Sequence, residues 1–126
     1  MLIIDSGGVS RLAERSTRTL ALIRAFRDGG LWPPIAPTVV LVESLQGNSG
    51  RDANTNRLLK TCIIETLITE RTARRAAELR RRARHGSAVD AIVVALAEPG
   101  GTILTGDTAD IEALAAHAHH VTVETI

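Results

Sequence analysis

Four acidic residues stand where short apolar runs end or an apolar helix begins, at well-separated points of the chain. They are Asp5, Glu43, Asp90 and Asp107, and Asp110 lies three residues beyond the last. Carboxylates that converge repel one another and raise each other's pKa, and a divalent cation relieves that repulsion. Ligand sets made only of oxygen select Mg²⁺ or Mn²⁺ over zinc. Such a site suits phosphodiester hydrolysis, in which the metal activates a water and neutralises charge on the phosphate.

The elements that must position these acids are short strands alternating with helices, because Gly and Pro divide the chain into brief β-type runs and helix-period segments. Strands are predicted at residues 2–4, 63–67, 102–104 and 121–125, and a further strand forms the start of 35–42. Helices are predicted at residues 9–14, 17–27, 54–61, 70–85, 87–98 and 108–117, and a further helix begins at about residue 41. This alternation predicts a parallel, about five-stranded sheet covered on both faces, an α/β/α sandwich forming one domain over residues 1–126. Ligands bind such sheets at the carboxyl ends of the strands.

Each acid also has a purely structural interpretation, in which it caps a helix, closes a turn or faces solvent. These interpretations are a turn at Asp5, a solvated helix face for Glu43, a capping box of Ser87 with Asp90, and a helix cap at Asp107 or Thr108 with Asp110 in the first turn. For any single acid the structural interpretation is favoured. The four together favour a shared site, because three come from separate loops at the ligand-binding side of the sheet and the fourth begins a helix that should be buried.

The order of these motifs resembles the PIN-domain ribonucleases, and within them the VapC-type toxins of toxin–antitoxin pairs. The resemblance covers essentially the whole chain and rests on segments 2–6, 43–47, 87–97 and 104–110, with a weaker match at 72–80. The resemblance depends on all four motifs occurring in the family's order.

The resemblance implies an endoribonuclease that depends on Mg²⁺ or Mn²⁺, forms a homodimer and is held inactive by a cognate antitoxin protein. It places the family's catalytic acids on Asp5, Glu43, Asp90 and Asp107, and a further metal-proximal acid on Asp110. The metal is expected on all of these except Glu43. Hydroxyl groups implied to orient the carboxylates or the water are those of Ser6 and Thr105.

Three features depart from the family's pattern. Gly7–Gly8 replace a small polar or apolar pair, which predicts a more mobile first loop. Val40 stands where Ser or Thr is common, which removes an expected helix cap. Asp107 follows Asp90 by about one residue less than expected, so the division of labour between Asp107 and Asp110 stays open.

Seven arginines lie between residues 71 and 84, on a predicted helix. Those expected to share one face are Arg71, Arg74, Arg75, Arg81 and Arg82. The functional interpretation is a strip that holds RNA phosphates and leads to the acidic site. For any one arginine, a solvated helix surface is the slightly favoured alternative. The histidines near residue 119 fit a helix C-terminus better than a metal site.

Composition narrows the classes of protein. The chain has 126 residues, a formal net charge of +1 and 2% aromatic residues, which disfavours binding by an overall basic field or by stacking of bases on aromatic side chains. The single Cys62 excludes an intrachain disulfide and a thiolate zinc cage. Neither a targeting segment nor a membrane-spanning run is recognised, so a cytoplasmic protein with no membrane partner is expected. The Leu31–Pro34 segment is an expected apolar patch for a partner.

Alternatives from other classes remain. A catalytically inactive PIN-fold module that acts only through a protein partner is the main one, and metal binding discriminates it from the enzyme. A haloacid-dehalogenase-type phosphotransferase is disfavoured because Gly7 stands where its second acid belongs. A receiver domain is disfavoured because no lysine follows Lys60.

Overall fold

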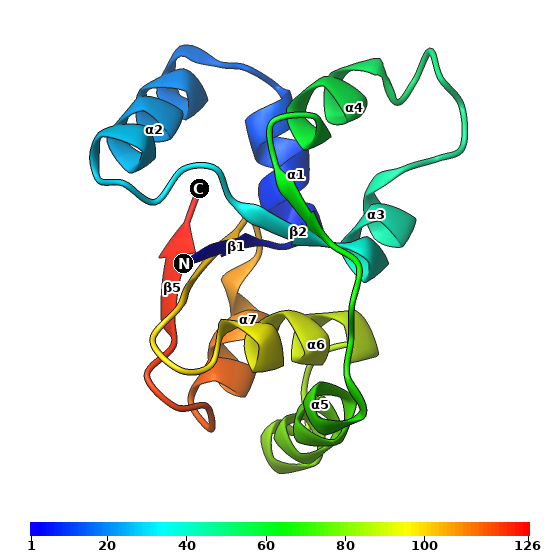
Figure 1. Ribbon diagram of the computed structural model, residues 1–126, viewed down its shortest axis with the longest axis vertical. Helices are drawn as coiled ribbons and strands as arrows, with labels where there is room; N and C mark the ends of the chain where they lie inside the picture. Colours follow the sequence, from blue (N-terminus) through cyan, green and yellow to red (C-terminus); the bar gives the residue numbers. More distant parts are fainter.

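The computed structural model describes all 126 residues as a five-stranded parallel sheet between two layers of helices (Figure 1). The strands are β1 (Leu2–Ile4), β2 (Ile35–Pro37), β3 (Ile63–Glu65), β4 (Thr102–Thr105) and β5 (Thr122–Thr125). The helices are α1 (Ser6–Ala13), α2 (Thr17–Asp28), α3 (Thr38–Ser44), α4 (Ala53–Leu59), α5 (Glu70–Ala83), α6 (Ala88–Ala97) and α7 (Thr108–Ala115). The predicted fold class is confirmed.

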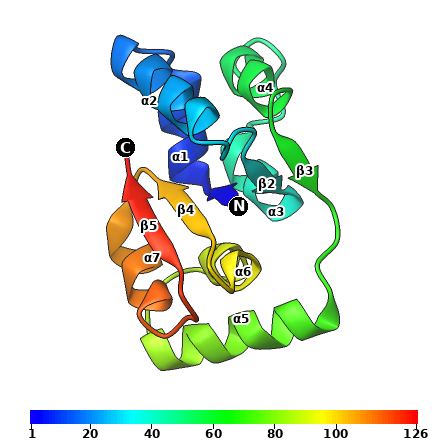
Figure 2. The same cartoon turned by 60° about the vertical axis from the view of Figure 1, so that its left-hand side comes forward.

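The strand order is β3-β2-β1-β4-β5, and every neighbouring pair is parallel. From β1 the chain adds β2 and then β3 toward one edge of the sheet. It then crosses through α5 and α6 to β4, which lies on the other side of β1, and β5 follows at the opposite edge. Helices α1 to α4 cover one face of the sheet, and α5 to α7 cover the other face (Figures 1 and 2). The strand order therefore reverses between β1 and β4, and the carboxyl ends of these two strands flank the switch point where α/β sheets bind ligands.

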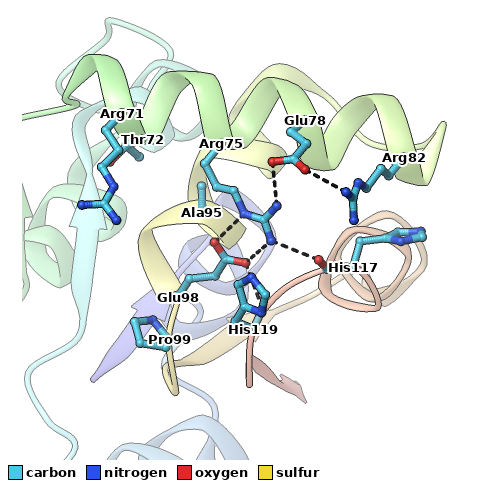
Figure 3. Close-up of a pocket in the computed structure, with 10 residues that line it drawn as sticks. All are labelled: Arg71, Thr72, Arg75, Glu78, Arg82, Ala95, Glu98, Pro99, His117 and His119. Carbon is cyan, nitrogen blue, oxygen red and sulfur yellow. Dashed lines mark hydrogen bonds and ion pairs between the residues drawn. The ribbon is translucent and has the colours of Figure 1, made fainter.

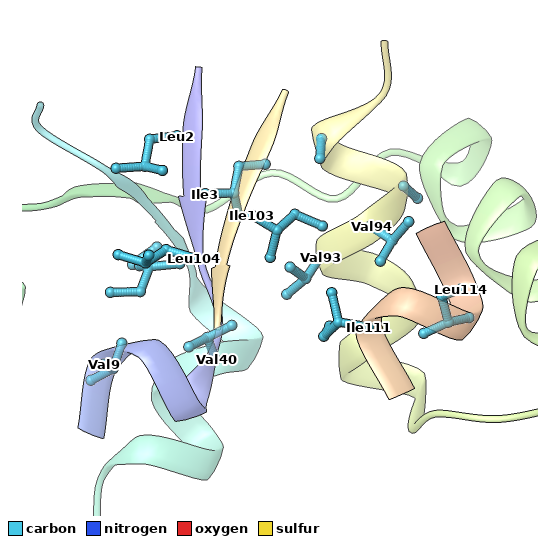
Figure 4. Packing of buried hydrophobic residues seen from close by; sticks show 14 of the residues in the cluster. Leu2, Ile3, Val9, Val40, Val93, Val94, Ile103, Leu104, Ile111 and Leu114 are labelled. Atoms are coloured by element: carbon cyan, nitrogen blue, oxygen red, sulfur yellow. The ribbon is translucent and has the colours of Figure 1, made fainter. Parts of the chain in front are cut away.

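The hydrophobic core lies on both faces of β1 and β4. All three residues of β1 are buried, as expected for the central strand of a sheet that is covered on both sides. Helix α6 is apolar on all sides because it packs between the sheet and α5, as the sequence predicts (Figure 4). The core therefore holds the start of α6, and Asp90 with it, against the sheet.

Three helices begin at hydroxyl caps that the sequence predicts. In α2, α5 and α6 the side chains of Ser16, Thr69 and Ser87 accept a hydrogen bond from the backbone N–H three residues later. Helix α5 ends two residues earlier than expected, because Arg84 takes a left-handed conformation with φ of 54°. These caps determine the residue at which each of the three helices begins.

Helix α1 begins at Ser6 rather than at Val9, and the expectation of a mobile first loop is wrong. The Asp5 side chain accepts from the Gly8 N–H and caps the helix. A Cβ on Gly8 would overlap the Leu104 carbonyl oxygen, and one on Gly7 would lie 2.9 Å from the Gly106 backbone nitrogen. The glycines are therefore contact points at which α1 packs directly on the end of β4.

Helix α3 begins at Thr38, about three residues earlier than predicted. Val40 consequently lies inside the helix and is fully buried, so the expectation that it stands at a missing cap is wrong. Glu43 is exposed and belongs to the last turn of α3 rather than the first. The boundary between β2 and α3 was difficult to predict because residues 35–42 are rich in β-branched residues, which are typical of strands but also occur in a short buried helix.

The loop after α3 is organised by a carboxylate that sequence reasoning did not single out. Asp52 is 4% exposed and accepts from the backbone N–H groups of Gln46, at 3.0 and 3.1 Å, and Asn48, at 3.1 Å. These hydrogen bonds compensate the burial of the Asp52 carboxylate.

No helix of the structure combines the length and apolar character that crossing a membrane would require.

Candidate functional site

Asp5 is the buried centre of the candidate site. It directly follows β1, is 5% exposed and caps α1, with its Oδ1 accepting from the Gly8 N–H at 2.6 Å. Its Oδ2 accepts from the Thr105 hydroxyl at 2.5 Å, across the switch point. The carboxylate is therefore held by one donor from α1 and one from β4, and the predicted turn at Asp5 is instead a helix cap.

Thr105 links the two loops of the switch point. It is fully buried at the end of β4, and its Oγ1 accepts from the Asp107 N–H at 3.1 Å. The same oxygen also lies 2.8 Å from the Asp107 carbonyl oxygen. A hydroxyl has one hydrogen to donate, and the charged carboxylate of Asp5 is the stronger acceptor. The hydroxyl of Ser6, the other group implied to orient an acid, makes no hydrogen bond to one.

Asp90 and Asp107 both have the capping roles that the structural interpretation predicts. Ser87 and Asp90 form a reciprocal capping box, with 2.8 Å from the Ser87 N–H to Asp90 Oδ2 and 3.1 Å from the Asp90 N–H to Ser87 Oγ. Asp107 caps α7, where its Oδ1 accepts from the Ala109 N–H at 3.4 Å. Capping uses one oxygen of each carboxylate and leaves the other available to a ligand.

The pKa values of two acids, Asp5 and Glu43, are raised in part by the charges of other acids. Burial is the main cause that raises the pKa of Asp5, opposed by its hydrogen bonds from Thr105 and Gly8, and the charges of Asp90 and Asp107 raise it further. Burial also raises the pKa of Glu43, and the charges of Asp90 and Asp5 add to this. Since Coulomb effects fall with distance, the fold brings four carboxylates into one region, from the end of β1, from α3, from α6 and from the residue before α7.

Asp110 stands apart from this acidic site, which we define as Asp5, Glu43, Asp90 and Asp107. Its Oδ1 lies 3.7 Å from Nδ1 of His85, and its side chain is 52% exposed. It does not contribute to the raised pKa of Asp5 or Glu43. Of Asp107 and Asp110, Asp107 is the one whose charge raises the pKa of the buried Asp5.

The ligand chemistry of the acidic site suits a divalent cation, whereas the present spacing of its side chains does not. The donors are all carboxylate oxygens, which suits a hard ion such as Mg²⁺ or Mn²⁺, and their mutual repulsion would be relieved by it. However, no three Asp, Glu, His or Cys side chains of the structure are grouped closely enough to hold a metal ion as they stand. The fold brings the acids into one region, but their side chains do not form a preorganised metal site.

Replacing Asp5 by Asn is expected to alter the pH dependence of folding. The raised pKa means that the folded chain binds this proton more tightly than the unfolded chain does. The stability that Asp5 confers in its protonated form is therefore lost as the pH rises through the raised pKa. In chelator-containing buffer, urea unfolding between about pH 4 and about pH 7 should show the wild type losing stability relative to Asp5→Asn as pH rises. A pH-independent difference would contradict this.

The arginines that the sequence places on one face of α5 are separated by the structure. Arg71, Arg75 and Arg82 line a pocket with Pro99 and His119, which precede β4 and β5 (Figure 3). This pocket lies at the amino ends of those strands, whereas the acidic site lies at the carboxyl ends. The three side chains therefore line a pocket that is separate from the acidic site. The other two arginines of the predicted strip, which are exposed and do not line the pocket, are Arg74 and Arg81.

Arg75 is the centre of an ion-pair network that sequence reasoning missed. Its guanidinium bonds both oxygens of Glu98, at 2.7 and 2.8 Å, and one oxygen of Glu78 at 2.9 Å. The side chains of Arg75 and Glu98 are 19% and 10% exposed. Hydrogen bonds from Arg75 are the main cause that lowers the pKa of both glutamates, so this network stabilises the fold at neutral pH and is lost on acidification.

The variant Arg75→Met is expected to destabilise the fold by about 2–3 kcal/mol, because Glu98 would keep a largely buried charge without its partner. The estimate lies below that for a fully buried pair because the network borders an open pocket. Arg74→Met is the matched control, since Arg74 is 78% exposed and pairs only with Glu70 on the same helix. Its expected cost is about 0.5 kcal/mol or less. Equal urea midpoints for the two variants would contradict the assignment.

Comparison with known proteins does not identify a family, because no family model matches the chain and no curated protein matches it in sequence.

Proposed function

We propose that the chain is an endoribonuclease that requires Mg²⁺ or Mn²⁺ and acts as the toxin of a toxin–antitoxin pair in the cytoplasm. The observation that carries the proposal is that the charge of Asp90 raises the pKa of both Asp5 and Glu43, although the three acids come from separate elements beside the switch point. The resemblance of the same residues to the PIN-domain motifs supports it. A divalent cation bound there would supply charge neutralisation for a scissile phosphate and a more acidic water.

The chain's own residues would have different parts in such a reaction. Asp5 is held from two sides by the Gly8 N–H and the Thr105 hydroxyl, so its oxygens are fixed before any ligand arrives. Glu43 is exposed and has a raised pKa, which makes it the member of the site best suited to exchange a proton with solvent. Asp90 and Asp107 are held by the helices they cap and present their remaining oxygens.

A groove among α1, α2 and α4 supports the proposed antitoxin partner. Its volume is about 340 Å³, and its apolar lining includes Leu20, Ile23 and the half-buried Trp32. The cationic residues that line it are Arg15, Arg24, Arg27 and Arg57. An amphipathic peptide with acidic and apolar side chains complements both features.

Exposed apolar side chains support the proposed homodimer. Val42 on α3 is 80% exposed, and Ile63 and Leu67, in and after the edge strand β3, are 53% and 67% exposed. Large apolar residues left in solvent beside a sheet edge are typical of a surface that a second chain covers.

A catalytically inactive binding module is the alternative that one observation favours. Asp5, Asp90 and Asp107 each cap a helix, and no three ligands are pre-arranged for a metal. In that case the acids would serve the fold alone.

Calorimetric titration with Mn²⁺ tests the proposal against this alternative. The wild type is expected to bind with a Kd between about 1 µM and about 1 mM, and saturating Mn²⁺ should raise the melting temperature by linkage. Asp90→Asn should lose most of this binding while it keeps the capping bond to Ser87, because an amide oxygen still accepts. Absence of Mn²⁺ binding to the wild type would refute the enzyme proposal and leave the binding module.

A further inference from the structure

We propose that the pocket beneath α5 binds the sugar–phosphate backbone of single-stranded RNA, as a contact surface remote from the acidic site. This α5 pocket has a volume of about 790 Å³ and lies between α5, the end of α6 and the turn before β5 (Figure 3). Its charged lining residues are Arg71, Arg75, Glu78, Arg82 and Glu98. The inference rests on the proposed function, because that function supplies the RNA.

The acceptors of the α5 pocket are already occupied. Both oxygens of Glu98 accept from Arg75, and one also accepts from the His119 N–H at 2.9 Å. The oxygens of Glu78 accept from Arg75 and from Arg82, each at 2.9 Å. A ligand that offers hydrogen-bond donors would therefore find no free carboxylate.

The donors of the α5 pocket are largely free. Arg71 makes no ion pair, and Arg82 contacts Glu78 through only one of its nitrogens. The imidazoles of His117 and His119 also border the space. Three arginines against two neutralised glutamates, with donors in excess, fit a ligand that carries negative charge and only acceptor oxygens. A phosphodiester has this character.

The spacing of the free arginines indicates several phosphates rather than one. Arg71 and Arg82 stand at opposite ends of the pocket, with Arg75 between them (Figure 3). Eleven residues separate them along α5, which corresponds to about 16 Å of helix. One phosphate is too small to contact both, whereas consecutive phosphates of a single strand can follow the helix.

The α5 pocket is close enough to the acidic site to share one RNA strand with it. Helix α6 joins the two, with Asp90 near its start and Glu98 just beyond its end. Eight residues of helix correspond to about 12 Å along the axis of α6. Because α6 is buried beneath α5, an RNA strand has to pass over the surface and cover more than this distance. A dinucleotide is too short for that, whereas twelve stacked nucleotides extend about 40 Å.

The test is fluorescence anisotropy of a labelled twelve-nucleotide single-stranded RNA with the full chain in EDTA, where binding is measured without cleavage. The variant Arg71→Gln with Arg82→Gln is expected to raise the Kd roughly tenfold and to reduce the slope of log K against log salt by about 1.4. The matched control carries Arg74→Gln and Arg81→Gln, which remove the same charge from α5 outside the pocket. It should shift the Kd less than about twofold.

The outcomes separate this inference from the proposed function. Equal weakening by the two double variants, or effective competition by inorganic phosphate or by polyglutamate, would overturn the pocket as a site for an RNA backbone. Pocket-dependent RNA binding in a chain that never cleaves RNA would retain the inference and refute the nuclease. Metal-dependent cleavage with the same Kd in wild type and in Arg71→Gln with Arg82→Gln would retain the nuclease and refute the pocket.

Discussion

Asp5→Asn is expected to lower Mn²⁺-dependent cleavage of RNA by roughly 100-fold or more, since loss of a group that only orients a metal ligand already costs about 10–100-fold. Asp5 is the one buried acid of the site, and the charges of Asp90 and Asp107 raise its pKa. Asn keeps the shape of the side chain and can still accept from the Gly8 N–H, so the cap of α1 should survive. The measurement is the initial rate on single-stranded RNA with and without chelator.

The matched control for this variant is Asp28→Asn, which makes the same chemical change at an exposed position at the end of α2. It should cleave at the wild-type rate. If Asp5→Asn, shown to be folded by circular dichroism, also cleaves at that rate, then the acidic site is not the catalytic site. The wild-type activity would in that case come from elsewhere in the molecule or from a contaminant.

Gly8→Ala is expected to destabilise the fold by about 2 kcal/mol or more, against the usual preference of helices for Ala. In an unobstructed helix the change would gain about 1 kcal/mol. Here the added Cβ would meet the Leu104 carbonyl oxygen and a side-chain carbon of Ile4. A backbone oxygen in the central strands cannot turn away as a flexible side chain can, so the overlap forces α1 off the sheet.

Urea unfolding measures this effect, and Ser10→Ala is its control on the exposed side of the same helix, with an expected change of about 0.5 kcal/mol or less. The displacement should also reach the acidic site, because the Gly8 N–H donates to Asp5. A stabilised Gly8→Ala variant would show that α1 can move outward freely. It would then contradict the close packing of α1 on β4.

An aspartate that caps a helix can also belong to a site that it shares with other acids, so the structural and functional interpretations of these residues do not exclude each other. A helix N-terminus attracts a carboxylate through its unpaired N–H groups and its dipole. At the carboxyl edge of a parallel sheet, the following helices begin side by side, so their capping acids are brought together as well. Asp5, Asp90 and Asp107 each occupy such a position.

The sequence predicted most elements because their signals are local. The hydroxyl caps at Ser16, Thr69 and Ser87 were recognisable from residue type and spacing, and so were the buried strand 2–4 and the apolar helix α6. The start of α3 was predicted too late because its composition resembles a strand. The mobility expected at Gly7–Gly8 was wrong because the reason for these glycines is a contact with β4, about a hundred residues away.

By itself, the sequence determined the α/β class, the alternation of strands and helices and the set of acids that lie at helix starts and strand ends, because propensity, periodicity and capping act over a few residues. Only the tertiary structure decided which side chains meet. In it, Asp5 accepts a hydrogen bond from Thr105 across the switch point, and Asp110 lies beside His85. Arg75 lies between two glutamates near the amino ends of the strands. These pairings depend on the order of the strands and the direction of each crossover, which no stretch of sequence encodes locally.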